Sequence, residues 1–168
     1  MIYYFTPFAP DKLYGRAINE HIKHLPDDSW ICVRDGDTMF LTSDYGHIIQ
    51  QAIIDNPGCD LFSCSTNRAF GQKMSNDPNV LTHYREAINR EKSYTKITGI
   101  VPAFFWVFNK RHWLKYPFDE HPIIHNRKSF DVRWCRDSHK WEMLRIDHLY
   151  IFHLYRLHKP RRDYSHLV

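Results

Sequence analysis

The chain has 168 residues, of which 43% are hydrophobic and 15% aromatic, enough to exclude a disordered protein and to fill one core. Its formal net charge is only +4 and its basic residues are mostly scattered, so we expect no nucleic-acid partner. No apolar run approaches the roughly 20 residues that cross a bilayer, and residues 1–5 lack the basic start of a signal peptide.

Strands and helices alternate through the first half of the chain. Residues 2–8 are rich in aromatic side chains and predict a strand, which prolines end. Asp11 is expected to cap a helix in which apolar residues between positions 13 and 25 recur every three or four positions. Residues 30–33 form a continuous apolar run, which is typical of a strand buried on both faces.

The same patterns predict the remaining elements. We expect a helix over residues 45–53 capped by Asp44, a strand at 61–65, a helix from Asp77-Pro78 to Ile88, a strand at 103–108, loops at 91–99 and 117–128, a helix at 130–139 and an extended segment at 141–146. The alternation predicts an α/β fold with a mainly parallel sheet flanked by helices. We assign residues 1–158 to a single domain and 159–168 to a basic tail.

Two carboxylates follow the predicted strand at residues 30–33, in the sequence Asp35-Gly36-Asp37. Open parallel sheets bind ligands beyond the carboxyl ends of their strands. Carboxylates there suit Mg²⁺ or Mn²⁺, which commonly hold one or two carboxylates together with substrate phosphates. With 14 aspartates in the chain, chance alone gives about one Asp-x-Asp, so the prediction depends on the motif's position between a strand and a helix. A polar turn, with either carboxylate bound to the backbone, is the alternative.

Two further segments contain candidate site residues. His153 lies among apolar residues, a setting that suits a metal ligand and equally a buried packing histidine. Arg156 follows, and it would either bind a phosphate or lie on the surface. Asp131 begins the predicted helix at 130–139, where an acidic side chain is either a cap or a general base.

The four cysteines contain no Cys-x-x-Cys pair. Cys32 and Cys64 lie within apolar runs, where a free thiol behaves as a small hydrophobic group. We therefore expect buried free thiols and no disulfide or zinc site. With no leader sequence predicted either, we expect a cytoplasmic protein, with peripheral association with a membrane left open.

Together these residues resemble the GT-A fold glycosyltransferases, near the family-2-like group. The family pattern begins with a strand, a helix carrying Gly and Asn, and an apolar strand ending in Asp-x-Asp. Later it has a helix that begins with an acidic residue, an aromatic and an Arg, and then a histidine that closes the metal site. The matching positions here are residues 2–8, Gly15, Asn19, Asp35–Asp37, Asp131, Trp134, Arg136 and His153. Residues 99–120 resemble the acceptor-side region.

The resemblance implies a metal-dependent glycosyltransferase that moves a sugar from a UDP- or GDP-sugar to a hydroxyl of a saccharide or another acceptor. Asp35, Asp37 and His153 would hold Mn²⁺ or Mg²⁺, and Arg156 would reach a phosphate. Asp35 would thereby also contact the donor. The bound ion would neutralise the charge that develops on the leaving diphosphate.

The resemblance also implies roles outside the metal site. Thr6 and Phe8 would border the nucleotide, and Asn67 and Arg68 would touch the sugar. Asp131 would deprotonate the acceptor if the reaction inverts the anomeric centre, with Asp119 and Glu120 as fallbacks. A retaining reaction would not need this base.

Three other functions stay open. A nucleotidyltransferase would use the same carboxylates, although Tyr14-Gly15-Arg16 is a poor version of a phosphate-binding loop. A metal-dependent hydrolase would need further acidic ligands. The N-terminal part is shorter than in the family, which is compatible with a non-catalytic nucleotide- or sugar-binding module derived from a transferase.

Overall fold

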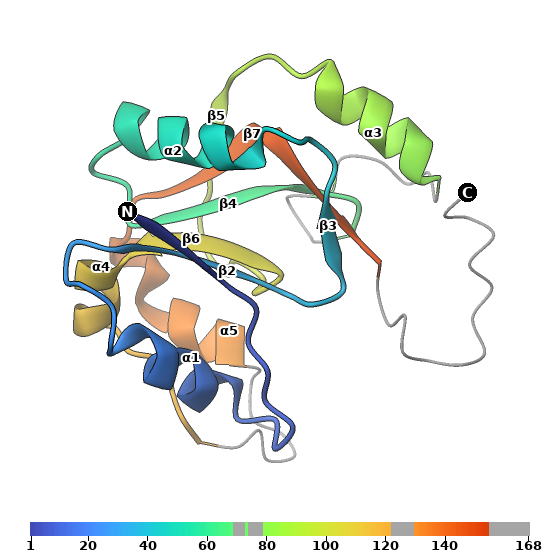
Figure 1. The fold of residues 1–168 in the computed structure, drawn as a ribbon. Coiled ribbons are helices and arrows are strands. Elements are labelled where there is room, and N and C mark those ends of the chain that lie inside the picture. The colour runs from blue at the N-terminus through green and yellow to red at the C-terminus, as the bar shows by residue number, and fades with distance from the viewer. Residues whose placement is uncertain (69–72, 74–78, 122–129, 155–168) are drawn as a thin grey trace.

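Helices lie on both faces of one sheet in the computed structural model, which describes residues 1–68, 73, 79–121 and 130–154 (Figure 1). The elements in chain order are β1 (Ile2–Phe5), α1 (Tyr14–Ile22), β2 (Trp30–Arg34), β3 (Thr38–Phe40), α2 (Tyr45–Asp55), β4 (Leu61–Thr66), α3 (Val80–Ile88), β5 (Tyr94–Lys96), β6 (Phe105–Asn109), α4 (Lys110–Lys115), α5 (Phe130–Trp134), the 3₁₀ helix η1 (Cys135–Lys140) and β7 (Met143–His153). The α/β class is therefore confirmed, whereas the proposed boundary between domain and tail at residue 158 lies outside the described residues.

The sheet is mixed and curled, so the prediction of a mainly parallel sheet is wrong. Its seven strands follow the order β1-β2-β6-β4-β7-β3, with β5 also paired to β7. The pairs β1–β2 and β4–β7 are parallel, and the other four pairs are antiparallel. The main cause is β6, which lies antiparallel between β2 and β4. The alternation of strands and helices along the chain does not show that a later strand lies between two earlier ones in the sheet.

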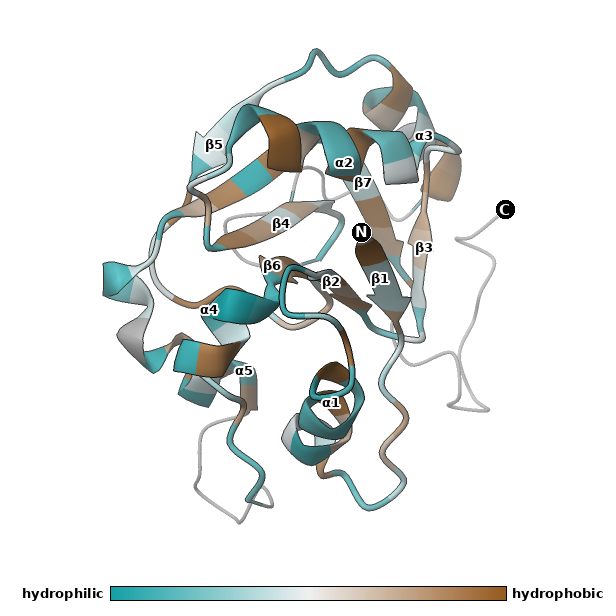
Figure 2. Ribbon diagram, turned by 60° about the vertical axis from the view of Figure 1, so that its left-hand side comes forward, coloured by the Kyte–Doolittle hydropathy of each residue, from teal (hydrophilic) through white to brown (hydrophobic). Residues whose placement is uncertain are grey.

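Side chains along β6 alternate between the two cores of the protein, as expected for a strand buried on both faces. Trp106 and Phe108 pack in the core beneath α1, α4 and α5, and Phe105 and Val107 pack in the core beneath α2. A smaller cluster joins Ala87 of α3 to β7. Figure 2 shows the same division, because the hydrophobic side of α1 is turned toward the strands.

Several element boundaries differ from the predicted ones. β1 ends at Phe5, so Thr6 and Phe8 lie in the loop that follows it. Asp11 lies before the N-cap of α1, where its carboxylate accepts a hydrogen bond from the Leu13 N–H at 3.0 Å. Asp44 occupies the N-cap position of α2 without a side-chain capping bond. Asn79 caps α3 by accepting a hydrogen bond from the Leu81 N–H at 2.8 Å, and the predicted start of this helix at Asp77-Pro78 lies outside the described residues.

Other elements are longer, shorter or new. The extended segment expected at 141–146 continues as β7 to His153, and the helix expected at 130–139 divides into α5 and η1. The loop expected at 91–99 contains β5. Neither β3 nor α4 was predicted, because each is short and lacks a clear apolar period.

Asn19 of α1 joins the helix to the chain that follows α4. Its Oδ1 accepts hydrogen bonds from Trp113 Nε1 at 2.7 Å and the Phe118 N–H at 3.1 Å. Its Nδ2 donates to the Phe118 carbonyl and to Glu120 Oε1, both at 2.8 Å. Every polar position of this buried amide is thereby satisfied, which fixes residues 118–120 against α1.

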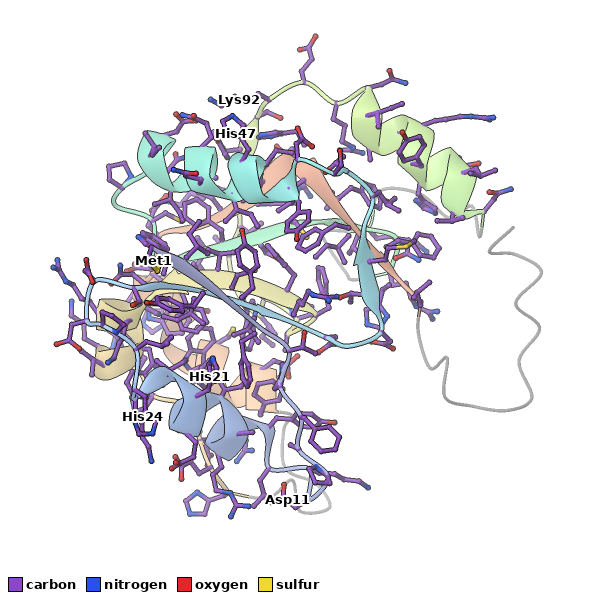
Figure 3. The ribbon with its side chains drawn as sticks, viewed as in Figure 1. Met1, Asp11, His21, His24, His47 and Lys92 are labelled. Carbon is purple, nitrogen blue, oxygen red and sulfur yellow. The ribbon has the colours of Figure 1, made fainter. Side chains whose placement is uncertain are left out.

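The four cysteines are buried and free, which confirms the predicted burial of the thiols. Burial raises the pKa of the Cys59 thiol to about 12 and that of Cys135 to about 11. Several histidines lie at the surface, including His21, His24 and His47 (Figure 3). None of the helices in the described ranges combines the length and the apolar character needed to cross a bilayer.

Candidate metal centre

The loop between β2 and β3, residues 35–37, is held at both ends by hydrogen bonds. The Asp35 N–H donates to the Phe104 carbonyl at 3.0 Å, which extends the pairing of β2 with β6 by one residue. The Thr38 hydroxyl donates to the Asp35 carbonyl at 2.6 Å, and the Arg34 guanidinium donates to the Thr38 carbonyl at 2.8 Å. These hydrogen bonds therefore fix the backbone of the turn that carries the two aspartates.

Gly36 has room for a side chain. A Cβ added there would meet Thr6 Cγ2 at 3.6 Å, an ordinary van der Waals contact, and Gly36 does not have a positive φ. Thr6 therefore lies near the 35–37 loop.

Antiparallel pairing of β3 with β7 brings His153 to this loop. Thr38 lies opposite His153 in the ladder, and the Leu154 N–H donates to the Asp37 carbonyl at 2.8 Å. His153 Nε2 then lies 3.7 Å from Asp35 Oδ2 and 3.8 Å from Asp37 Oδ1. We call these three residues the carboxylate–histidine cluster.

The donor set of the cluster fits a hard divalent ion. One ligand atom from each residue lies within 4.8 Å of the others. At a ligand distance of about 2.1 Å, octahedral neighbours are about 3.0 Å apart and opposite ligands about 4.2 Å apart. The nitrogen–oxygen separations of 3.7 and 3.8 Å lie between these limits.

Exposure in the cluster suits an ion shared with a ligand from solvent. The side chain of His153 is 16% exposed, those of Asp37 and Asp35 28% and 42%. The histidine thus forms the buried wall, and the carboxylates open toward solvent. Mg²⁺ and Mn²⁺ sites of this kind take their remaining ligands from water or phosphate oxygens.

Asn67 is adjacent to the cluster, but its amide contacts the protein backbone. Its Oδ1 accepts a hydrogen bond from the His153 N–H at 2.8 Å, and its Nδ2 donates to the His153 carbonyl at 3.2 Å. The sequence placed Asn67 at the end of a strand but could not show this contact across 86 positions. Arg68, the next residue, is exposed.

The other predicted site residues have different positions. Phe8 is 83% exposed in the loop after β1. Asp131 lies in the first turn of α5, where its Oδ1 accepts a hydrogen bond from the Val132 N–H at 2.8 Å. Arg156 lies outside the described residues.

The two fallback carboxylates are engaged elsewhere. Asp119 accepts a hydrogen bond from the His121 N–H at 2.9 Å and from Arg133 at 2.6 Å. The His121 N–H above all, together with the His121 side chain and Arg133, lowers the pKa of Asp119, which weakens it as a base. Glu120 accepts the hydrogen bond from Asn19.

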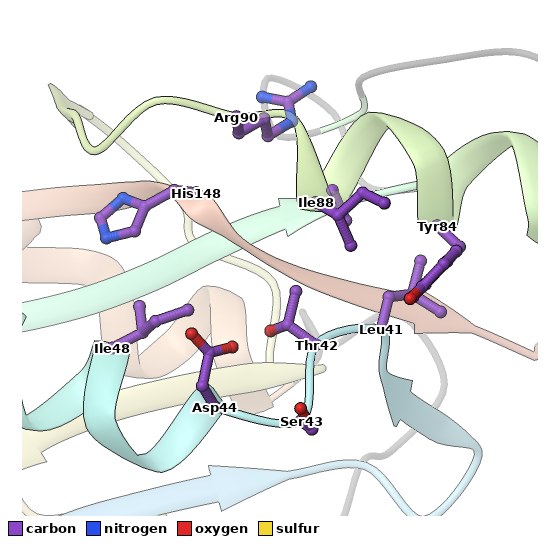
Figure 4. Close-up of a pocket in the computed structure, with 10 residues that line it drawn as sticks. Leu41, Thr42, Ser43, Asp44, Ile48, Tyr84, Ile88, Arg90 and His148 are labelled. Atoms are coloured by element: carbon purple, nitrogen blue, oxygen red, sulfur yellow. The ribbon is translucent and has the colours of Figure 1, made fainter.

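A separate groove of about 430 Å³ lies between the start of α2, α3 and β7 (Figure 4). Leu41, Ile48 and Ile88 form its apolar walls, and Asp44 and Arg90 contribute charges. Its lining does not include any member of the carboxylate–histidine cluster. Sequence patterns did not single out the groove, because its walls come from three elements far apart in the chain.

No model of a known protein family matches this chain, and no curated protein matches it in sequence.

Proposed function

We propose that this protein is a metal-dependent glycosyltransferase of the GT-A type that uses a nucleotide-diphosphate sugar as donor. The observation that supports the proposal most is the convergence of Asp35, Asp37 and His153 from two distant parts of the sequence. A polar turn alone would explain the two aspartates, but it would not explain a histidine directed at both carboxylates. Two carboxylates and one imidazole suit Mn²⁺ or Mg²⁺ and leave positions for phosphate oxygens.

In this proposal, the chain orients the donor around the cluster. Asp35, Asp37 and His153 would hold the cation, which would supply positive charge to stabilise the departing diphosphate. Thr6 and Phe8 border the nucleotide, and Arg68 contacts the sugar. The Asn67 amide is engaged with the backbone of His153, so Asn67 is not part of the proposed sugar contacts. Arg156 remains the candidate for a second phosphate contact.

The transfer step needs a base if it inverts the anomeric centre. The acceptor oxygen attacks the anomeric carbon, the bond from that carbon to the diphosphate oxygen breaks, and the hydroxyl proton passes to the Asp131 carboxylate. A positioned base contributes about 10²–10⁴-fold to such a step. The donor would be a UDP- or GDP-sugar and the acceptor a saccharide or another hydroxyl compound.

Thermal unfolding with UDP or GDP tests the proposal. Either nucleotide should raise the melting temperature in the presence of Mn²⁺ or Mg²⁺, because a ligand at 100 times its dissociation constant adds about 2.7 kcal/mol of stability. EDTA should abolish the shift. An equal shift with EDTA present would exclude metal-bridged binding, and binding without transfer to any acceptor would indicate a non-catalytic module.

A further inference from the structure

The side chain of Asn67 forms hydrogen bonds with the backbone of His153, the last residue of β7, as a neighbouring strand would. β4 ends at Thr66, which pairs with Ile151, so the backbone ladder between β4 and β7 stops two residues before His153. Beyond that point the Asn67 amide both accepts from the His153 N–H and donates to the His153 carbonyl. The amide therefore supplies the donor and acceptor that a further backbone pair would have supplied.

His153 is held from both edges of its strand. Its own N–H and carbonyl point toward β4 and bind Asn67, and the N–H of the next residue, Leu154, points toward β3 and binds the Asp37 carbonyl. Adjacent residues of a strand direct their backbone groups to opposite edges. The direction of the Cα–Cβ bond is set by the backbone. These hydrogen bonds together therefore fix the direction in which the imidazole projects from β7.

The backbone of His153 determines the orientation of the Asn67 amide, because its N–H only donates and its carbonyl only accepts. The buried Thr66 hydroxyl donates to Asn67 Oδ1 at 3.2 Å, so this oxygen accepts two hydrogen bonds. Turning the amide over would place its NH₂ against the His153 N–H and its oxygen against the His153 carbonyl. Only one orientation therefore satisfies both backbone groups of His153, and the Thr66 hydroxyl adds a second hydrogen bond to Oδ1 in that orientation.

We propose that Asn67 is a positioning residue, which directs the His153 imidazole toward Asp35 and Asp37 and has no direct contact with the ion or the donor. This inference rests on the proposed metal site. Without the amide, the N–H and carbonyl of His153 lose the two hydrogen bonds that Asn67 provides at the end of β7. The imidazole should then sample other positions, and the ion affinity should fall. Loss of a residue that orients a metal ligand typically weakens binding about 10–100-fold.

Ser65 offers a matched control. It precedes Thr66 on β4, it is fully buried, and its hydroxyl donates to the Asp147 carbonyl of β7 at 2.9 Å. Ser65→Ala therefore also removes a hydrogen bond between a β4 side chain and the β7 backbone, but away from His153. Mn²⁺ titrations of the folded variants should show at least tenfold weaker binding for Asn67→Ala and a change under twofold for Ser65→Ala.

A double-mutant cycle separates positioning from direct contact. If Asn67 acts through His153, then Asn67→Ala should cause no further loss of Mn²⁺ affinity in a His153→Ala background. An equal loss in both backgrounds, or wild-type affinity in Asn67→Ala alone, would overturn the inference.

Amide hydrogen exchange tests the inference without metal. The His153 amide should lose at least tenfold protection in Asn67→Ala and keep its protection in Ser65→Ala, and unchanged protection in Asn67→Ala would contradict the inference. If the wild-type protein binds no Mn²⁺, the metal site and the proposed function fail, and the role of Asn67 as a ligand-positioning residue fails with them. Exchange then reports only on the backbone contact.

Discussion

Gly15 and the backbone of Asp119 are in closer contact than any side chain at position 15 would allow. A Cβ at Gly15 would lie 2.1 Å from the Asp119 carbonyl oxygen and 3.3 Å from the Phe118 Cβ. The neighbour is backbone, so rotation of a side chain cannot relieve the clash. The glycine therefore sets how closely α1 approaches the segment that Asn19 holds.

Gly15→Ala should destabilise the protein by about 1–3 kcal/mol, the usual cost of overpacking a filled contact. Gly58→Ala is the control, because a Cβ there meets nothing within 4 Å and the residue does not have a positive φ. That variant should be neutral or more stable by about 0.4–1 kcal/mol. Chemical denaturation measures both, and equal stabilities would show that α1 can move away from residues 118–120 at no cost.

The buried histidine His112 should make the protein less stable in mild acid. Burial lowers the pKa of His112 and outweighs the attraction of Asp60, whose Oδ1 lies 3.3 Å from Nδ1. Below a pH of about 6.5, His112 is therefore protonated in the unfolded chain but stays neutral in the folded protein until its lowered pKa is reached. The free energy of unfolding should fall as the pH decreases from about 7 through the lowered pKa.

His112→Gln should flatten this pH dependence, even though it also lowers stability at neutral pH. His24→Gln, at an exposed position shown in Figure 3, should leave the dependence as in the wild-type protein. Urea denaturation at a series of pH values makes the comparison. Identical slopes in the His112 variant and the wild-type protein would assign the acid sensitivity to other groups.

Substitutions in the carboxylate–histidine cluster should affect ion affinity before they affect folding. His153→Ala and Asp37→Ala should each weaken metal-dependent nucleotide binding at least tenfold, because each removes one of three protein ligands. Asp44→Ala, which removes an exposed carboxylate from the groove, should leave binding unchanged. Calorimetric titration of Mn²⁺ and nucleotide measures the affinities. A His153→Ala protein with a lower melting temperature and normal ion affinity would indicate a packing histidine.

Asp131→Asn should separate transfer from donor binding. Asparagine preserves the shape of the side chain and its acceptor oxygen for the Val132 N–H, so folding should survive. Donor binding should stay nearly constant, and sugar transfer should fall about 10²–10⁴-fold in an inverting enzyme. Near-normal transfer by the variant would exclude Asp131 as the base and favour a retaining mechanism or another carboxylate.

Local patterns in the sequence predicted the elements that border the site. The apolar run of β2 and the aspartates after it are adjacent in sequence, so their relation was visible without a structure. The helices α1 and α2 have enough turns for an apolar period to appear. In contrast, β3 has only three residues and follows the 35–37 loop directly, so its sequence could not be distinguished from a turn.

Strand order and long-range contacts could not be predicted in this way. The position of β6 between β2 and β4 depends on packing of the whole chain, so the sequence wrongly suggested a mainly parallel sheet. His153 was a candidate because of its neighbours, but its approach to Asp35 depends on the pairing of β3 with β7. The contact of Asn67 with His153 involves backbone atoms, which every residue has, and it therefore leaves no sequence signal.

The 35–37 loop joins β2 to β3 and is so short that it limits how flat the sheet can become. β2 and β3 are four positions apart in the strand order, which in a flat sheet would separate them by about 19 Å. Four residue steps from Arg34 to Thr38 reach only about 14 Å. The sheet must therefore bend until its distant strands come within reach. The curvature of the sheet and the spacing of the two aspartates are therefore coupled. Any change that flattens the sheet would stretch the loop that carries both carboxylates.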